Sequence, residues 1–279
     1  MKKISRRSFL AAAGLSVAAL ALTACGGSSA STASSVASSA ASSEAASTSA
    51  AAGELTTVEA GKLTMATNAT FPPYEMTTDA GDIEGIDVET AQAIADKLGL
   101  EPQIDDMDFD AALLSVQQGK ADIVMAGVTV TDERKAVMDF SDSYATGIQS
   151  IIVPEGSDIA SPDDLAGKKI GTQRGTTGYI YCSDDFGDDA VVAYDNGLTA
   201  VQALNNGQVD AVVIDNAPAK EYVAANPGLA ILDTSYAEED YAIGMAKGSS
   251  LEAAVNAALE ELKADGTLQS IVDKYITAE

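Results

Sequence analysis

Tyr144-Ala-Thr-Gly-Ile-Gln-Ser-Ile-Ile-Val153 is one of two long extended stretches in this chain, and the second runs from Ala230 to Met245. Short α/β patterns stand before, between and after them. If both stretches connect two α/β lobes, the sequence predicts one lobe from 54–148 plus 239–279 and a second from 149–238. Each lobe then has an ordinary domain size. Two lobes joined by two strands form a hinged clamp that can close on a ligand.

The chain around these stretches alternates β-type runs with amphipathic helices, which favours an α/β architecture. Apolar residues recur at spacings of three and four from Val88 to Leu98, and Gly99 follows as a helix C-cap. The other predicted helices are Phe109–Val116, Leu251–Leu262 and Leu268–Tyr275. The predicted strands are Leu63–Thr67, Asp122–Ala126, Lys169–Thr172, Ala190–Tyr194 and Asp210–Ile214.

Residues 1–24 have the pattern of an export signal. Four positive charges and no acid precede a 15-residue apolar run, Phe9 to Thr23. A membrane-spanning helix needs about 20 apolar residues, so this run is too short to be one. Leu22-Thr-Ala-Cys25 resembles the lipobox of bacterial lipoproteins, which implies that Cys25 receives a lipid and becomes the mature N-terminus. We therefore expect a lipid-anchored protein on the outer face of the bacterial cytoplasmic membrane.

Two alternatives remain for export and anchoring. Ser5-Arg-Arg-Ser-Phe-Leu10 also resembles the twin-arginine export motif, although Ala11 stands where that motif often has a lysine. An ordinary secretory signal with a chance cysteine at position 25 would leave the protein unanchored. After Cys25, the chain to residue 53 is nearly all Ser, Ala, Thr and Gly, which favours a flexible linker.

The composition excludes several classes of function. The formal net charge is −26 and becomes about −30 without residues 1–24, which hold four of the 16 basic residues and none of the 42 acids. This charge argues against nucleic acid as a partner. The chain has no histidine, and its only cysteines are Cys25 and Cys182. Zinc sites and Ser-His or Cys-His catalysis are therefore excluded, and we expect neither a metal nor a cofactor.

Five segments carry a resemblance to a known family. They are Ala66-Thr-Asn-Ala-Thr-Phe-Pro-Pro-Tyr-Glu75 with Gly85-Ile-Asp-Val-Glu89, Ala126-Gly-Val-Thr-Val-Thr-Asp-Glu-Arg134 with Phe140-Ser-Asp-Ser-Tyr144, Asp164-Leu-Ala-Gly-Lys-Lys-Ile-Gly-Thr-Gln-Arg-Gly-Thr-Thr177, Asp210-Ala-Val-Val-Ile-Asp215, and Leu262-Lys-Ala-Asp-Gly-Thr-Leu268. In this order they resemble the polar amino-acid-binding proteins of ABC importers, the family 3 extracellular solute-binding proteins. The resemblance implies a two-lobed, type II periplasmic-binding-protein-like fold, an amino-acid ligand, an ABC permease as partner and a monomer.

The chemistry of these segments suits a free amino acid, whose carboxylate and ammonium must both be paired when buried. Arg134 can bind the carboxylate through two parallel charge-assisted hydrogen bonds. The resemblance implies that the N–H groups of Thr129 and Thr177 complete the carboxylate site. It also implies that Asp215 pairs with the ammonium, together with the Gly127 carbonyl and the Thr129 hydroxyl. These residues come from both predicted lobes, so one ligand needs both and favours closure.

The other expected contacts surround the side chain of the ligand. Phe71 and Phe109 match aromatic positions that flank it in relatives, although each alone would be read as a core residue. Asn68 stands where relatives that bind cationic amino acids often carry an acid, so we expect a neutral polar ligand. An acidic ligand using Arg174 stays open. The full expected set is Asn68, Phe71, Phe109, Ala126, Gly127, Thr129, Arg134, Gln173, Thr176, Thr177 and Asp215.

Each charged residue also has a simpler structural interpretation. Arg134 could pair with the adjacent Asp132 or Glu133, Asp215 could cap the helix that follows it, and Arg174 could be a surface residue. Asp106-Met-Asp-Phe-Asp110 begins like a calcium loop. It lacks the required turn glycine and the acid at the twelfth position, so calcium binding is not expected.

Three functions therefore compete. The leading hypothesis is a non-enzymatic, solute-binding lipoprotein that delivers an amino acid to an ABC permease. Arogenate and prephenate dehydratases also resemble this fold, and Glu75 would be the nearest candidate for their general acid. The third hypothesis is a ligand-sensing lipoprotein.

Overall fold

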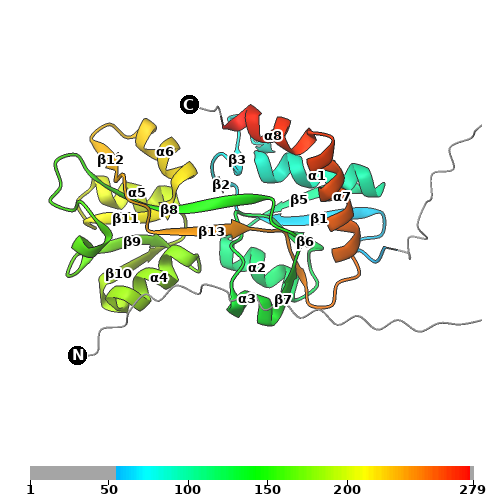
Figure 1. Cartoon of the computed structure of the whole chain (residues 1–279), viewed down its shortest axis with the longest axis horizontal. Coiled ribbons are helices and arrows are strands. Elements are labelled where there is room, and N and C mark those ends of the chain that lie inside the picture. The colour runs from blue at the N-terminus through cyan, green and yellow to red at the C-terminus, as the bar shows by residue number, and fades with distance from the viewer. Residues whose placement is uncertain (1–54, 277–279) are drawn as a thin grey trace, which may run out of the picture. The chain divides into compact units, whose positions relative to one another are not determined.

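Two strands, β8 (Ala145–Pro154) and β13 (Ala237–Tyr241), connect the two α/β lobes of the protein. The computed structural model describes residues 55–276, and Figure 1 shows both strands running side by side between the lobes. They pair antiparallel, with Ala145 opposite Tyr241 and Gln149 opposite Ala237. The predicted signal peptide, Cys25 and the linker lie outside the described residues.

The first lobe is built on a five-stranded sheet with the order β5-β1-β6-β14-β7. β1 pairs in parallel with β5 and β6, whereas β14 pairs antiparallel with β6 and β7. The C-terminal ends of β1 and β6 therefore lie at the same edge of the sheet. The strands are β1 (Lys62–Thr67), β5 (Glu101–Asp106), β6 (Ile123–Val124), β7 (Met138–Phe140) and β14 (Gly244–Ala246).

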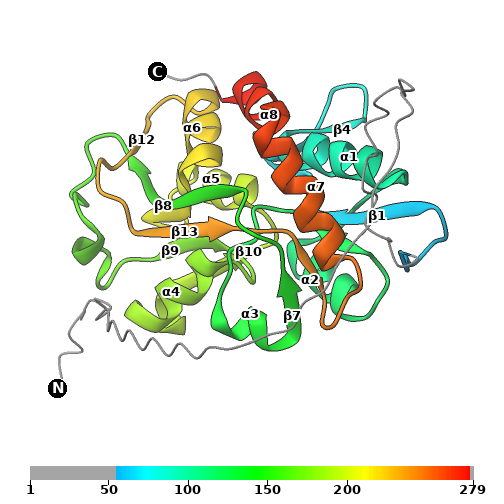
Figure 2. The same ribbon diagram turned by 45° about the vertical axis from the view of Figure 1, so that its right-hand side comes forward.

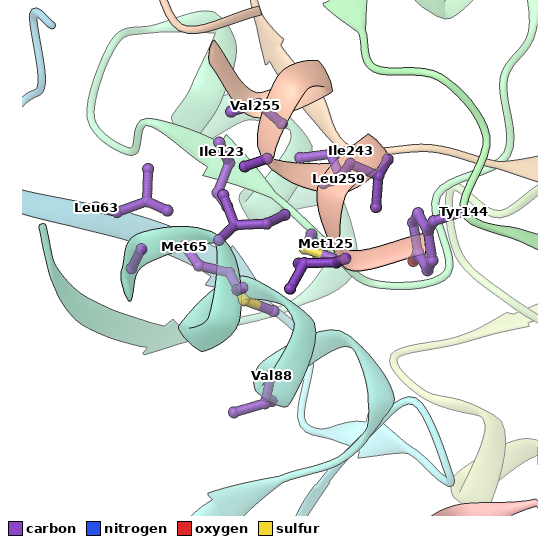
Figure 3. Packing of buried hydrophobic residues seen from close by; sticks show 14 of the residues in the cluster. Leu63, Met65, Val88, Ile123, Met125, Tyr144, Ile243, Val255 and Leu259 are labelled. Atoms are coloured by element: carbon purple, nitrogen blue, oxygen red, sulfur yellow. The ribbon is translucent and has the colours of Figure 1, made fainter. Parts of the chain in front are cut away.

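Helices cover both faces of this sheet. One core cluster joins strand residues such as Met65 and Ile123 to α1, α7 and α8, and Figure 3 shows its packing. The other face packs against α2 through Phe109, Ala112 and Val116. The helices are α1 (Ile86–Leu98), α2 (Phe109–Gln117), α3 (Asp132–Val137), α7 (Glu252–Ala264) and α8 (Thr267–Tyr275).

The second lobe is built on a sheet with the order β10-β9-β11-β8-β12, and β13 also pairs with β8. Alternate residues of β11 point to opposite faces, as strand geometry requires. Val212 and Ile214 pack with α5 and α6, whereas Ala211 and Val213 pack with α4. The elements are β9 (Ile170–Gln173), β10 (Val191–Tyr194), β11 (Ala211–Asp215), β12 (Leu229–Ile231), α4 (Thr177–Phe186), α5 (Gly197–Asn205) and α6 (Asn216–Ala225).

Short elements complete the structure. A small antiparallel sheet consists of β2 (Thr70–Phe71), β3 (Glu75–Thr77) and β4 (Ile83–Glu84). Two single-turn 3-10 helices lie at Pro162–Leu165 and Asp188–Ala190. Figure 2 shows α7 and α8 together on the first lobe and α5 and α6 together on the second. None of the helices between residues 55 and 276 is long and apolar enough to cross a membrane.

The predicted elements are confirmed within a few residues, with one difference. Gly99 ends α1 in the left-handed conformation, with φ 69°, as the C-cap prediction requires. The stretch from Ala230 to Met245 is not one connector but parts of three strands. β12 pairs with β8 as an edge of the second sheet, and only β13 accompanies β8 between the lobes. Extended sequence alone does not show where a strand turns to a new partner.

Gly147 of β8 lies against the ring of Tyr241, which is only 1% exposed. A Cβ at this position would lie 2.5 Å from the ring, so Gly147→Ala must displace Tyr241 or the strand. We expect the substitution to lower the free energy of unfolding by about 1–3 kcal/mol in urea denaturation. Thr146→Ala, on the exposed side of β8, is the control and should stay within about 0.5 kcal/mol of wild type. Equal stabilities for Gly147→Ala and the control would show that β8 and Tyr241 are not tightly packed.

Candidate functional site

A cavity that is partly open to solvent lies where residues of the two lobes meet. All eleven expected ligand-binding residues line this one cavity. The structure also adds five residues that the sequence analysis did not assign to the site. The lining is Asn68, Phe71, Glu75, Phe109, Ala126, Gly127, Thr129, Arg134, Gln149, Gln173, Thr176, Thr177, Val213, Ile214, Asp215 and Tyr241.

The topology explains why residues distant in sequence meet here. Asn68 follows β1 and Ala126 follows β6, two parallel strands of the first sheet. Gln173 ends β9 and Asp215 ends β11, two parallel strands of the second. In open α/β sheets, ligands bind at the carboxyl ends of the strands. The two carboxyl edges meet at the cavity because β8 and β13 connect the lobes.

Arg134 is buried, with 9% of its surface exposed, and its guanidinium is held by main-chain groups. Nη1 donates to the Thr129 carbonyl at 2.8 Å, and Nη2 donates to the Gly175 carbonyl at 3.2 Å. The guanidinium carbon lies 5.4 Å from the ring centroid of Phe109. Burial lowers the pKa of Arg134.

Arg134 forms no ion pair with a carboxylate among residues 55–276. The simpler interpretation as a partner of Asp132 or Glu133 is therefore wrong, because both of these side chains are exposed. A buried charge is costly unless it is paired. The cavity thus presents a positive charge that makes no direct ion pair with any described residue, although the buried carboxylate of Glu239 acts on it from a longer distance.

Asp215 supplies the opposite charge from the second lobe. It is 2% exposed, accepts from the Ala217 N–H at 3.2 Å as the N-cap of α6, and accepts from the Tyr241 hydroxyl. Asp215 therefore caps α6 and also lines the cavity. Burial raises its pKa to about 6, although the hydrogen bonds from Tyr241 and Ala217 oppose the rise. A cation at this point would favour the ionised form.

Contacts between the lobes surround the cavity. Asn68 Oδ1 accepts from Gln173 Nε2 at 2.9 Å, and the hydroxyls of Thr129 and Thr177 are 3.5 Å apart. The Thr129 hydroxyl donates to Glu239 Oε2 at 3.1 Å, a carboxylate on the connecting strand β13. These contacts show the two lobes in touch with each other around the site.

The N-terminus of α4 also points its donors toward this region. Thr176 is the N-cap, and its side chain accepts from the Tyr179 N–H at 3.3 Å. Thr177 is the first helical residue, 3% exposed, where main-chain N–H groups have no partner within the helix. Such a helix start favours an anionic group. Arg174, by contrast, is exposed, lies 3.9 Å from Asp195 and does not line the cavity.

Glu75 is the main residue whose place the sequence did not reveal. Its side chain is completely buried and lines the cavity. Asp87, also completely buried, lies beside it and accepts from the Gly127 N–H at 3.0 Å and from the Tyr144 hydroxyl at 2.7 Å. Burial and the neighbouring Asp87 raise the pKa of Glu75 well above its usual value. No three His, Cys, Asp or Glu residues between 55 and 276 are grouped to hold a metal ion.

The sequence matches the family of bacterial extracellular solute-binding proteins, family 3, over residues 63–278. The chain belongs to this family. This family 3 protein is 34% identical over 278 residues to a "Probable histidine-binding protein" of Neisseria gonorrhoeae, covering 96% of this chain and 95% of the relative. It is 34% identical over 226 residues to the "L-cystine-binding protein TcyJ" of Escherichia coli, covering 79% of this chain and 85% of that one.

The fold is also that of solved binding proteins. A structure described as "An ancestral arginine-binding protein bound to glutamine" superposes with a TM-score of 0.75 and 43% identity. The match covers 78% of this chain and 99% of that one. The relatives are solute-binding proteins with amino-acid ligands, and the two-lobed, type II fold expected from sequence is confirmed.

The raised pKa of Asp215 makes a prediction for stability. Its folded pKa of about 6 exceeds the ordinary value of 3.8, so the folded state binds more protons than the unfolded state between these values. The contribution of Asp215 to the free energy of unfolding, ~3 kcal/mol, is therefore fully present below about pH 4 and is lost as the pH rises through 6. Asp215→Asn cannot ionise and should escape this loss.

Urea unfolding of the ligand-free protein between pH 4 and 7 checks this. As the pH rises, the free energy of unfolding of Asp215→Asn should increase by ~3 kcal/mol relative to that of the wild type. Other buried acids act equally in both proteins and cancel. A difference that stays constant over this pH range would mean that Asp215 ionises at its ordinary pKa.

Proposed function

We propose that this protein captures a polar amino acid in the cavity and delivers it to the membrane subunits of an ABC importer. The observation that carries the proposal is the buried Arg134 guanidinium, which has no carboxylate partner in the described chain and shares its cavity with Asp215. A cation without a direct ion pair and an anion in the same cavity complement a zwitterion.

In this proposal the ligand carboxylate pairs with the Arg134 guanidinium and accepts hydrogen bonds from the main-chain N–H groups of Thr129 and Thr177. The guanidinium can use donors that its two carbonyl contacts leave available. The ammonium lies on Asp215, with the Gly127 carbonyl and the Thr129 hydroxyl. The rings of Phe71 and Phe109 flank the side chain.

Closure of the clamp follows from this arrangement. Arg134 and Thr129 belong to the first lobe, and Asp215 and Thr177 to the second. A ligand that contacts all four binds the closed form more tightly than an open form, and this difference drives closure. We place the lobe boundaries at 148/149 and 238/239, within β8 and at β13, so these two strands serve as the hinge.

The cellular setting is part of the same proposal. Residues 1–24 direct export and Cys25 carries a lipid, so the folded body is tethered outside the cytoplasmic membrane by residues 25–53. The proposal also takes the folded body to be a monomer. The names of the relatives, which include histidine-, cystine- and arginine-binding proteins, support an amino-acid ligand and a binding role rather than an enzymatic one. A signalling role would use the same site and differ only in the membrane partner.

Removal of the Arg134 guanidinium, the proposed partner of the ligand carboxylate, should weaken ligand binding severely. Arg134→Ala is expected to weaken binding of L-glutamine, L-arginine, L-histidine or L-cystine, whichever the wild type binds, by about 3–5 kcal/mol. Isothermal titration calorimetry measures this change. Arg134→Lys is the matched control that keeps the charge and loses the planar fork, so its loss should be smaller. Near-normal affinity of Arg134→Ala would remove the proposed carboxylate site.

The ammonium partner can be tested with a ligand pair. Asp215→Asn should weaken L-glutamine by about 2–4 kcal/mol, because a charge-assisted bond to the ammonium is lost. Glutaramate has the same side-chain amide and carboxylate but no α-ammonium, so its weaker binding should change little between the two proteins. Competition calorimetry gives both affinities. Equal losses for the two ligands would contradict the assignment of Asp215.

A further inference from the structure

Glu239 is a buried acid that the proposed function does not use. It lies in the middle of β13, opposite Gly147 of β8, and is 6% exposed. Its Oε2 accepts from the Thr129 hydroxyl at 3.1 Å and from Gln149 Nε2 at 3.0 Å. Its Oε1 is buried without a hydrogen-bond partner among residues 55–276, which costs free energy of folding. Both hydrogen bonds therefore go to one oxygen, and both donors are side chains that line the ligand cavity.

Glu239 stands behind the cavity and does not line it. Main-chain hydrogen bonds of 3.0 and 3.1 Å hold residues 128–130 against residues 240–242, so the backbone of Thr129 is fixed beside the end of β13. The contact between the Thr129 hydroxyl and Glu239 is thus a contact between two anchored segments. Any effect of Glu239 on a ligand passes through the side chain of Thr129 or through the electric field of the acid.

The acid determines the direction of the hydrogen bonds that Thr129 makes. A carboxylate can only accept, and a hydroxyl has a single hydrogen and two lone pairs. Because the hydrogen of the Thr129 hydroxyl points to Glu239, its oxygen can only accept from every other neighbour. The Thr177 hydroxyl, 3.5 Å away, must then be the donor in that contact. One lone pair of the Thr129 oxygen remains for a donor in the cavity.

The charge of Glu239 acts on the same site. Burial lowers the pKa of Arg134, and Glu239 opposes this lowering more than any other group of the described chain. A carboxylate that enters the cavity competes with Glu239 for the field of this guanidinium. An ammonium, by contrast, is attracted by the acid and finds the Thr129 oxygen ready to accept. The same residue therefore disfavours a lone anion and favours a cation beside it.

The proposed function places the ligand carboxylate on Arg134 and the ammonium on Asp215, the Gly127 carbonyl and the Thr129 hydroxyl. Resting on that assignment, we propose that Glu239 is a positioning residue that makes the site selective for the α-ammonium. It holds the Thr129 hydroxyl as an acceptor, so an α-amino acid binds in preference to the same acid without its amino group. Plain carboxylates of the same shape are thereby excluded.

Glu239→Gln tests the proposal with ligand pairs that differ only in the α-amino group. The pairs are L-glutamine with glutaramate, L-arginine with δ-guanidinovalerate, and L-histidine with imidazolepropionate. The substitution keeps the shape, removes the charge and supplies an amide that can donate to the Thr129 hydroxyl. The amino acid should weaken about tenfold, whereas its deaminated partner should keep its affinity or gain. Competition calorimetry on the pair that the wild type binds gives both values.

Glu238→Gln is the matched control, because it removes the same charge from the neighbouring, exposed position of β13. Both ligands should stay within about twofold of wild type. Equal weakening of the two ligands in Glu239→Gln would mean that the acid only supports the connecting strands, and it would overturn the proposal. An unchanged preference for the amino acid would do the same.

A double-mutant cycle decides the matter with the amino acid alone, even where the deaminated partner binds too weakly to measure. Thr129→Val removes the hydroxyl and keeps the main-chain carbonyl to which Arg134 donates. In this background Glu239→Gln should weaken the amino acid by no more than about twofold, because the acid acts through the missing hydroxyl. A full tenfold loss in both backgrounds would show that Glu239 does not act through Thr129.

The outcomes also separate this inference from the proposed function. If the wild type binds amino acids but Glu239→Gln leaves their selectivity unchanged, the inference fails and the proposed function stands. Silence of the folded, ligand-stripped wild type toward all twenty common amino acids overturns both.

Discussion

The burial of the Arg134 guanidinium is the constraint on which the rest of the site depends. Its two hydrogen bonds go to main-chain carbonyls, Thr129 in the first lobe and Gly175 in the second. Carbonyl dipoles and the ring of Phe109 stabilise the charge but do not cancel it. An anion in the cavity would do so, and it would bind at the point where the two lobes already touch. Ligand binding and lobe contact therefore act on the same group.

The connecting strands make this coupling mechanical as well as electrostatic. Tyr241 belongs to β13, and its hydroxyl donates to Asp215 of the second lobe. Its ring occupies the space beside Gly127 and Gly147, where a Cβ would lie within 3.2 Å and 2.5 Å of it. Glu239 on the same strand accepts from Thr129 and Gln149. A movement of the lobes about β8 and β13 thus alters the environment of both charged partners of the ligand.

Much of this structure could be predicted from sequence because local pattern determines it. The period of three and four in α1, the glycine after it and the short β-branched strands specify their elements locally. Arg134, Asp215 and Thr177 were found because their segments resemble a family. Tyr241 and Gln149 were missed since they lie on strands that looked like plain connectors. The sequence offers Glu75 only as a candidate general acid. Its complete burial and its lack of a hydrogen-bond donor appear only in the folded structure.

A calorimetric titration of refolded, ligand-stripped protein with matched pairs of ligands tests whether the Arg134 guanidinium anchors the ligand. L-Histidine against histamine and L-arginine against agmatine differ in the α-carboxylate alone. We expect one or more L-amino acids to bind with a stoichiometry of one, and removal of the carboxylate to weaken binding by several kcal/mol, since Arg134 would again lack a direct ion pair. Amines that bind as tightly as their amino acids would show that the buried guanidinium is not the anchor of the ligand.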